Sequence, residues 1–563
     1  MKRNTLTTAV LAGLTGMAGM VSVSNAININ PDGLGQVLLY PYYTTRGGND
    51  TLISIVNTTS QGKAVKIRFI EALNSREVLD FNIYMSAWDV WTAAIVDSAS
   101  TDGARFITAD TTCTTPYFFG NPIYDMGNGL FGADFVNYTY TENAFFDAND
   151  RGPQGLDRTR SGYIEVIEMG VLGVDEINNE DVGLAAEHVK PADNTAPAMP
   201  PTSGSAGVFA DTRCGLFQER WIEARFPNGN GIWFNGTDGA GPSGNLNDNT
   251  RGISAPTGGL FGNAAIINNE AGTMFGYEAT AIDNFWADGQ IGHRRPQDTE
   301  PSLATTQNTT SVVFISGLNQ PQTEEWDSPL DAINHVLAVE TLMNEYNVHP
   351  GLAANSEWIV TLPSKRLHVD AADGGPRVGA VAPIPPFTEL WTNNSPQSCD
   401  VVGVEIWDRE EQLVEFVGDP GQGAICPSPF VCDPEEPDDV VFELCREANV
   451  IRFGIGDDAP AMAEISGEPS VDVAGVYGFV NFPLPAAGAP GPNQGYPFME
   501  GWSRLGFQAF TSRESLNGRV ATGLPAIGFW ANTFTNDAVT DGVLANYGGA
   551  FRHRGSRAPL ATP

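Results

Sequence analysis

Residues 36–96 show the clearest pattern of hydrophobic and polar positions in the chain. Residues 65–69 (VKIRF) and 79–83 (LDFNI) alternate hydrophobic with charged or polar side chains. Successive side chains of a strand point to opposite faces, so a period of two predicts one buried face and one face in water. Both runs are therefore interpreted as half-buried antiparallel strands.

Two further runs in this stretch, 52–56 (LISIV) and 90–96 (VWTAAIV), are largely apolar and typical of more fully buried strands. Turn-forming residues such as 46–50 (RGGND) separate the runs. Short strands divided by turns at this spacing predict an immunoglobulin-like β-sandwich over residues 27–115.

The next region, residues 116–325, has a looser pattern. Residues 162–168 (GYIEVIE) and 264–268 are predicted strands. Between them, residues 190–207 are rich in Pro, Ala and Ser, and residues 228–259 are rich in Gly and Asn. Such compositions favour long loops, so we predict a β-rich region with insertions.

The last region, residues 326–563, contains one segment with helical spacing. Asp327, Ser328 and Pro329 form a helix-start signal, and hydrophobic residues then recur at helical spacing as far as Tyr346. The spacing predicts a helix over about 328–346. Strands are predicted at 358–362, 401–407, 449–455, 476–482, 504–510 and 526–533. The predicted fold class is mainly β, with a few helices, long loops and disulfide-bonded loops in this last region.

The N-terminus has the features of a signal peptide. Two basic residues precede an uncharged, mostly apolar run over 9–23, and residues 24–26 (SNA) place small side chains where a signal peptidase cleaves. We predict removal of residues 1–26 and a mature chain that begins at Ile27. The protein is then exported, either secreted or displayed on the cell surface, with the periplasm as the alternative. No later apolar run has the length of a membrane helix.

The net charge restricts the partners. Removing residues 1–26 takes away Lys2 and Arg3 and no acid, so the formal charge of −37 becomes −39. So many carboxylates repel nucleic acid and anionic lipid, both of which bind to a cationic face. We therefore expect no nucleic-acid partner, which leaves a glycan, a protein or a cell surface.

The six cysteines predict disulfides, because an even number in an exported chain is typical of an oxidised framework. Their order favours three pairs: Cys113 with Cys214, Cys399 with Cys445, and Cys426 with Cys432. Six cysteines allow fifteen sets of pairs, so other connectivities stay open. A zinc site is not favoured, because the C-x-x-C spacing is absent and no histidine lies close by in the sequence.

Several segments, spread over most of the mature chain, resemble a family of secreted or cell-surface proteins of Gram-negative bacteria. The resembling segments are 35–44 (GQVLLYPYYT), 79–86 with 89–91, 162–170 (GYIEVIEMG), 344–346 (NEY), 358–366 (WIVTLPSKR) and 544–549 (LANYGG). The resemblance implies export and a fold shared over the whole length. It implies no activity, substrate, cofactor or site residue.

The sequence contains no motif for a catalytic site. The nucleophile elbow, the P-loop, the Rossmann glycine pattern and HExxH are absent, and the six histidines have no metal-binding spacing. Carboxylate groups such as Glu165 with Glu168, or Asp408 with Glu410 and Glu411, are expected by chance among 67 acids. We therefore assign no catalytic or cofactor-binding residue.

Calcium is the cofactor that the acidic segments favour most. Asp147, Asn149 and Asp150 resemble the first half of an EF-hand loop, although Arg158 stands where such a loop has its bidentate Glu. A second acidic segment holds Asp433, Glu435, Glu436, Asp438 and Asp439. The alternatives are an ordinary Asx-rich turn for the first segment and a solvated loop for the second.

Two groups of aromatic residues are candidates for a sugar-stacking surface. The candidates are Trp88 with Trp91, or Tyr40 with Tyr42 and Tyr43. Packing in strands and cores is the simpler interpretation, since aromatic residues favour strands.

The function we expect is non-catalytic: an exported protein with a structural or adhesive role. It rests on the missing catalytic motifs together with disulfides, many loops and an acidic surface. One alternative is an extracellular hydrolase of polysaccharide or another polymer, which needs two carboxylates across a cleft. A second alternative is a calcium-dependent binding protein.

Overall fold

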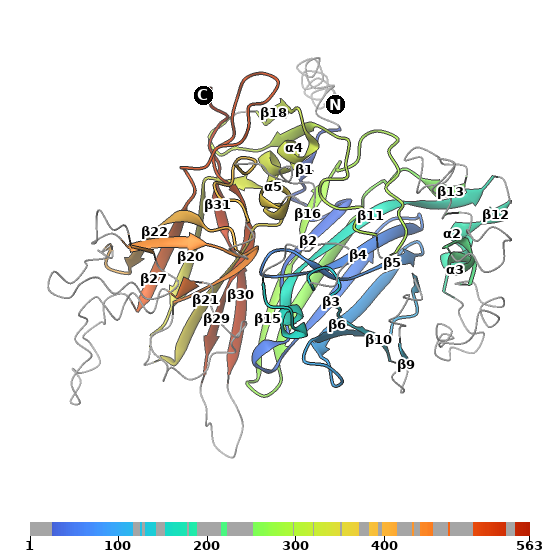
Figure 1. Cartoon of the computed structure of the whole chain (residues 1–563), viewed down its shortest axis with the longest axis horizontal. Coiled ribbons are helices and arrows are strands. Elements are labelled where there is room, and N and C mark those ends of the chain that lie inside the picture. Colours follow the sequence, from blue (N-terminus) through green and yellow to red (C-terminus); the bar gives the residue numbers. More distant parts are fainter. Residues whose placement is uncertain are drawn as a thin grey trace, which may run out of the picture.

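The computed structural model shows two β-rich halves that lie side by side, with short helices near their junction at one end (Figure 1). Of the predicted signal peptide only residues 25 and 26 are described. In the described part of the chain no helix is both long and apolar enough to span a membrane. The described residues are 25–115, 124–125, 130–141, 152–176, 179–188, 215–221, 233, 251–296, 298–318, 320–349, 352–370, 382–391, 397–411, 413, 431–432, 440–453, 471–472, 499–535 and 546–562.

The first half is built from two antiparallel sheets. A nine-stranded sheet has the order β1 (Asn28–Ile29), β16 (Thr280–Asp283), β2 (Val37–Thr44), β11 (Ser161–Asp175), β4 (Lys63–Glu71), β5 (Glu77–Met85) and β8 (Cys113–Thr115), with β12 (Glu180–Asp181) and β13 (Arg251–Ser254) paired to β11. A seven-stranded sheet has the order β15 (Thr273–Glu278), β14 (Leu260–Asn268), β3 (Asn49–Asn57), β6 (Val90–Asp97), β7 (Ala104–Thr108), β10 (Phe131–Asp134) and β9 (Tyr124–Asp125).

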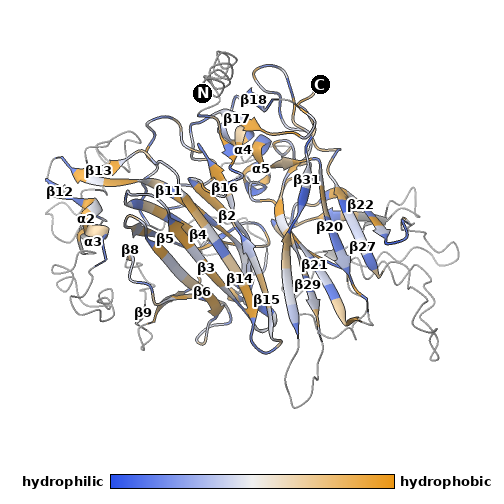
Figure 2. Ribbon diagram, turned by 180° about the vertical axis from the view of Figure 1, so that it is seen from behind, coloured by the Kyte–Doolittle hydropathy of each residue, from blue (hydrophilic) through white to orange (hydrophobic). Residues whose placement is uncertain are grey.

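A hydrophobic core joins these two sheets. Ile53 and Ile55 of β3 and Val65 and Ile67 of β4 belong to one buried cluster, and Figure 2 shows hydrophobic residues along the strands of both sheets. The predicted mainly-β class is confirmed. Strands β11 and β14 pair with β2, β4 and β3, so later parts of the chain contribute to the sheets of the first region. Immunoglobulin-like strand order and the region boundaries stay predictions.

The prediction that β4 and β5 each keep one face in water is wrong. Every residue of β4 is buried, including its charged positions. The cover comes from a segment far away in the sequence, because the Lys66 ammonium donates to the Asp298 carbonyl and the Asn82 amide donates to the Arg294 carbonyl. The charged groups pair with one another, and Lys66 Nζ lies 2.6 Å from Asp80 Oδ2.

The second half also contains two sheets. A five-stranded sheet has the order β26 (Val471–Asp472), β25 (Ala448–Arg452), β21 (Ala354–Thr361), β29 (Ile527–Phe534) and β30 (Tyr547–Arg552). A six-stranded sheet has the order β23 (Val431–Cys432), β24 (Val440–Leu444), β22 (Asp400–Asp408), β27 (Glu500–Gly506), β20 (Thr341–Asn347) and β31 (Arg554–Ser556). A second core cluster joins them, with Trp358 and Val360 from β21 and Ile406 and Leu505 from β22 and β27.

The five-stranded sheet lies between the two halves. Ile359 of β21 and Phe529 of β29 belong to the first core cluster, while the neighbouring Trp358 and Val360 belong to the second. Both faces of the central strands β21 and β29 are therefore largely buried, whereas the edge strand β30 is partly exposed. The six-stranded sheet has one face on the second core, so its other face is an outer surface of the molecule.

Short elements complete the fold. The helices are α2 (Val182–Ala186), α3 (Gly215–Trp221), α4 (Pro329–Leu337) and α5 (Arg366–Val369), with 3-10 turns η1 (Arg46–Gly48) and η2 (Leu156–Arg160). Two small sheets pair β17 (Thr310–Val313) with β18 (Gln322–Glu325) and β19 (Ala338–Val339) with β28 (Leu524–Pro525).

The predicted helix over 328–346 is correct at its start and wrong at its end. Ser328 caps α4, since its hydroxyl accepts a hydrogen bond from the Leu330 amide, and Pro329 follows as the first helical residue. The helix ends at Leu337. The next residues pair with β28 and then form β20, so pairing with distant strands overrides the local helical spacing.

Most of the other predicted strands are present in the structure. The strands at 162–168, 264–268, 358–362, 401–407, 449–455 and 526–533 correspond to β11, β14, β21, β22, β25 and β29, with ends shifted by a few residues. The strand predicted at 504–510 overlaps β27, which ends at Gly506. The strand predicted at 476–482 lies outside the described residues.

Candidate functional site

The eight predicted calcium ligands lie outside the described residues: Asp147, Asn149, Asp150, Asp433, Glu435, Glu436, Asp438 and Asp439. Arg158, at the twelfth position of the first segment, is described. Its buried guanidinium lies 2.9 Å from the Glu71 carboxylate, so it belongs to an internal ion pair. The calcium hypothesis stays a prediction for both segments.

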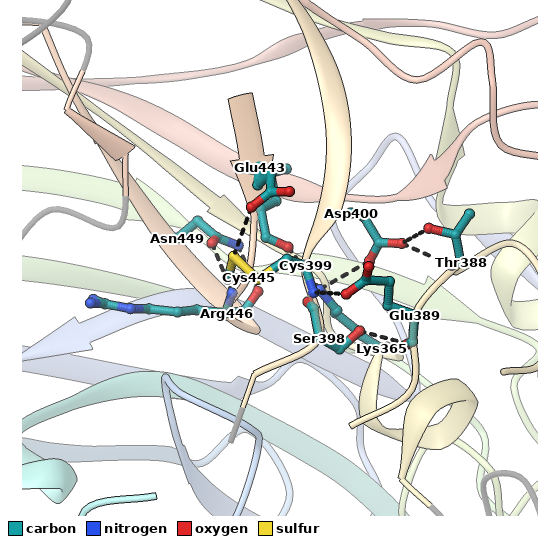
Figure 3. The surroundings of a disulfide bond; sticks show 11 residues. Lys365, Thr388, Glu389, Ser398, Cys399, Asp400, Glu443, Cys445, Arg446 and Asn449 are labelled. Atoms are coloured by element: carbon teal, nitrogen blue, oxygen red, sulfur yellow. Dashed lines mark hydrogen bonds and ion pairs between the residues drawn. A yellow bond between two sulfur atoms is a disulfide. The ribbon is translucent and has the colours of Figure 1, made fainter. Parts of the chain in front are cut away.

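The predicted disulfide between Cys399 and Cys445 is confirmed, with its sulfur atoms 2.07 Å apart (Figure 3). It joins the start of β22 to the end of β24. Glu443 lies beside it, and in the described residues these three side chains form the one close group of potential metal ligands. Because the two sulfurs are bonded to each other, neither is a free thiolate, and we assign no metal to this group.

The remaining predicted disulfides are tested only in part. Cys113 is disulfide-bonded. Its predicted partner, Cys214, lies outside the described residues, as does Cys426, and nothing is described of the side chain of Cys432. Both of these pairings therefore stay predictions.

The carboxylates Glu165 and Glu168 of β11 are part of the core. Arg68 donates to Glu165, and Lys63 Nζ lies 2.7 Å from Glu168 Oε1. All four side chains are completely buried. Buried acids neutralised in this way support the sheet and do not face a substrate.

The described histidines occupy separate places. Burial lowers the pKa of four of them: His293, His335, His368 and His553. His188 is partly exposed, and a hydrogen bond to Asp89 at 3.2 Å raises its pKa. In the described residues none of these five belongs to a close group of three potential metal ligands, so we interpret each of them as a structural histidine.

The aromatic residues singled out from the sequence do not form a sugar-binding surface. Tyr40, Tyr42, Tyr43 and Trp91 are at most 1% exposed and pack in the first core, so neither predicted group is a platform. Trp88 is 66% exposed, in the turn before β6. The simpler interpretation, packing in a core, is confirmed for these four residues.

A different set of aromatic and charged side chains lies on the six-stranded sheet. The pattern E-x-W-x-R occurs at 405–409 (EIWDR), along β22, and again at 500–504 (EGWSR), along β27. The strands pair antiparallel with Trp407 opposite Trp502 and Glu405 opposite Arg504. We call the six patterned residues the tryptophan platform: Glu405, Trp407, Arg409, Glu500, Trp502 and Arg504.

The two indoles form the centre of the tryptophan platform. Their ring centroids are 4.2 Å apart and their planes differ by 9°, so the rings are stacked. The Arg504 guanidinium lies 5.4 Å from the centroid of the Trp407 ring, within the range of a cation–π contact. Trp502 stays 39% exposed, so part of this aromatic surface faces water.

An ion pair lies on each side of the stacked indoles. Arg409 Nη1 is 2.7 Å from Glu500 Oε2 on one side, and Arg504 pairs with Glu405 on the other. Antiparallel pairing of two copies of one pattern produces this symmetry, because each Glu then meets an Arg. The ion pairs leave hydrogen-bonding groups at both edges of the aromatic surface.

Local sequence explains how the tryptophan platform forms. Ile406 and Leu505 alternate with the platform residues and point into the second core. Gly501 lets the strands approach closely, because a Cβ there would lie 1.9 Å from the Trp407 carbonyl oxygen. The glycine is therefore needed where Trp502 stacks.

Sequence reasoning missed these residues, although a usable signal was present. It placed 401–407 in a strand but looked for stacking among aromatic residues that are neighbours in the sequence. The repeated E-x-W-x-R pattern on two strands was the signal, since only antiparallel pairing makes the two copies complementary.

The outer face of the seven-stranded sheet offers a second surface feature. It is a groove of about 690 Å³ lined by small and apolar side chains of the sheet, among them Leu52, Ala94 and Ala265. Glu278 is its one charged lining residue. The tryptophan platform combines apolar surface with more hydrogen-bonding groups, which makes it the better candidate for a polar ligand.

Comparison of the chain with models of protein families, with curated proteins and with solved structures finds no match. Its function is therefore inferred from the site itself.

Proposed function

We propose that this chain is an exported, non-catalytic protein with an adhesive or structural role, and that its tryptophan platform binds an uncharged polysaccharide. The observation that carries the proposal is the stacked, partly exposed pair of Trp407 and Trp502 between two ion pairs. Elsewhere the chain buries large indoles in its cores, as it does for Trp91, Trp233, Trp326 and Trp358.

The chemistry of the tryptophan platform suits a sugar ring. The C–H face of a pyranose packs on an aromatic ring, and its hydroxyls exchange hydrogen bonds with carboxylate and guanidinium groups at the ring's edge. Glu345 of β20 extends this polar rim, since it pairs in register with Trp502 and is exposed. A row of side chains across three strands matches an extended polymer better than a single small sugar.

The charge of the chain favours an uncharged ligand. A mature chain with a formal charge of −39 repels polymers that carry carboxylate or sulfate groups. Within the tryptophan platform each arginine is neutralised by a glutamate, so no local excess of positive charge offsets the repulsion.

A structural role for the indole pair is the competing explanation, because cross-strand aromatic pairs also stabilise sheets. Binding and folding can be separated by measuring both. We expect the mature protein to be retained on at least one neutral polysaccharide from a panel of insoluble β-glucan, poly-N-acetylglucosamine and mannan. We expect no retention on a polyuronate, and no release of reducing ends from any member.

The variant that tests the tryptophan platform is Trp502→Ala. Loss of one aromatic stacking contact, taken as about 1–3 kcal/mol as for stacked bases, lowers the affinity by a factor of about 5 to 150. Trp88→Ala is the matched control, because Trp88 is also an exposed tryptophan but lies outside the platform. Equal retention of both variants and the unmodified protein would contradict the proposal, as would a protein that binds no member of the panel.

A further inference from the structure

Lysine is rare in this chain, and the described lysines are buried. The mature sequence has lysine only at positions 63, 66, 190 and 365. Lys63, Lys66 and Lys365 are described, and the side chain of each is at most 1% exposed and lies beside a carboxylate. Each pair therefore holds the two groups from which an amide bond forms, in a site that excludes water.

Lys365 and Asp400 are arranged as reactants (Figure 3). Lys365 precedes α5, Asp400 is the first residue of β22, and Lys365 Nζ lies 3.1 Å from Asp400 Oδ2. The same nitrogen donates to the backbone carbonyls of Ser398 and Leu444. In the neutral amine those two bonds use both N–H groups, so the lone pair is left to face the Asp400 carboxyl group.

The Asp400 carboxyl group is polarised from its other side. Its Oδ1 accepts hydrogen bonds from the Thr388 amide at 2.8 Å and the Thr388 hydroxyl at 2.9 Å. Two donors on one oxygen stabilise the negative charge that develops there when a nucleophile adds to the carboxyl carbon. Among the described residues Asp400 Oδ2 has no hydrogen bond beyond its ion pair with Lys365, so this oxygen is the one placed to leave.

Lys365 and Asp400 meet in a site that is shielded from water. Both side chains are almost completely buried, and the Phe387 ring centroid lies 5.6 Å from Lys365 Nζ. A buried ion pair carries a desolvation penalty that a neutral amide does not.

We propose that Lys365 and Asp400 condense after folding into an intramolecular isopeptide bond. A bond forms between Lys365 Nζ and Asp400 Cγ, and the Cγ–Oδ2 bond breaks. Of the three hydrogens on the ammonium group, one stays on the amide nitrogen and two leave with Oδ2 as water. The reaction therefore needs no oxidant, reductant or co-reactant. Thr388 stabilises the tetrahedral intermediate, and a proton passes from the nitrogen to the leaving Oδ2, which lies 3.1 Å from it in the ion pair.

The fold favours this condensation, which is unfavourable between free groups in water. Holding the nitrogen next to the carboxyl group replaces a bimolecular encounter by an intramolecular step. The product is a neutral amide where a buried ion pair stood, and the released water passes to solvent. The bond would join the start of α5 to β22, directly beside the disulfide that joins β22 to β24. Two adjacent cross-links would suit an exported protein that bears mechanical load.

The pair of Lys63 and Glu168 lacks this arrangement. The Thr257 amide donates to Glu168 Oε1 and the Gly258 amide donates to Oε2, so both carboxylate oxygens are engaged by the backbone. Neither oxygen is placed to leave, and we expect this pair to stay ionic.

Intact-mass measurement of the folded mature protein, unfolded and reduced just before analysis, tests the proposal. The expected mass is lower by one water molecule than that of the fully reduced mature sequence. Proteolysis should then yield a branched peptide that joins the segment containing Lys365 to the one containing Asp400. The branched peptide decides, because a succinimide also loses one water. A full mass with an unbranched Lys365 peptide would overturn the proposal.

Variants give independent readouts. Asp400→Asn should lose one ammonia in place of one water, since the amide nitrogen then leaves. Lys365→Arg should keep its full mass, whereas the control Lys63→Arg should still lose one water. If the variants fail to fold, the branched peptide of the unmodified protein still decides. Protein that is recovered and kept in urea, so that it never folds, should keep its full mass. Loss of water from this unfolded protein would show that the bond does not depend on the folded site.

Discussion

The polar face of β4 and the outer face of β27 come from similar sequence and lie in opposite environments. In β4 charged residues alternate with apolar ones, and the outer face of β27 carries Glu500 and Arg504 on either side of Trp502. On β27 Arg504 pairs with Glu405, and both side chains are at least a third exposed. On β4 Arg68 pairs with Glu165, and both are completely buried. The same type of ion pair is therefore internal in one half of the molecule and superficial in the other.

The two faces differ because a distant part of the chain covers the polar face of β4. The carbonyls of Arg294 and Asp298 receive hydrogen bonds from polar side chains of β5 and β4. On β27, Trp502 stays 39% exposed. A polar strand face of this kind can bind a segment of its own chain or an external ligand. We infer a structural role for the covered face and a binding role for the open one.

The largest expected effect comes from removing the cation of the covered face. Arg68→Met leaves the carboxylates of Glu77 and Glu165 without the guanidinium that contacts both of them. Breaking a buried ion pair in this way costs about 3–5 kcal/mol of unfolding free energy. Urea denaturation of the variant and the unmodified protein measures the difference. A loss below about 1 kcal/mol would mean that water reaches this face.

A smaller effect is expected from pH, through a buried acid. The pKa of Glu447 is raised from 4.5 to about 8 by burial, so the folded protein keeps a proton that the unfolded chain releases above pH 4.5. This contribution is complete below that pH and is lost as the pH rises towards 8, by about 3 kcal/mol between pH 5 and pH 8. Denaturation curves at several pH values measure it. Glu447→Gln should flatten the dependence, and an equally steep curve would assign it to another group.

The smallest effect is expected on the open face. Arg504→Met makes the same substitution as Arg68→Met but removes an exposed ion pair with Glu405, which contributes at most about 1 kcal/mol. The same urea experiment serves both variants. Equal losses for the two would remove the distinction between the covered and the open face.

The local pattern of hydrophobic and polar residues predicted where strands and helices lie. It did not predict which other parts of the chain pack against them. The alternation in 65–69 and 79–83 located β4 and β5 but not their cover, which lies more than two hundred residues further along the chain. The cap at Ser328 located the start of α4, whereas its end depended on pairing with β27 and β28. Long-range pairing of this kind leaves little trace in a short window of sequence.

The candidate site was less predictable for the same reason. Trp407 and Trp502 are far apart in the sequence and meet only through the register of β22 and β27. The Cys399–Cys445 disulfide was predictable because the chain has only six cysteines, four of them in its last region. Lys365 and Asp400 carry no sequence motif, and only the fold brings them together.

Hydroxyl-radical footprinting of the protein, with and without a saturating neutral polysaccharide that retains it, shows whether the tryptophan platform is the surface that binds the polymer. Oxidation of each tryptophan is read by mass spectrometry after proteolysis. We expect strong protection of Trp502 by the polymer and unchanged oxidation of Trp88, which is 66% exposed outside the tryptophan platform. Protection of Trp88 with unchanged oxidation of Trp502 would place the binding surface elsewhere and refute polysaccharide binding by the tryptophan platform.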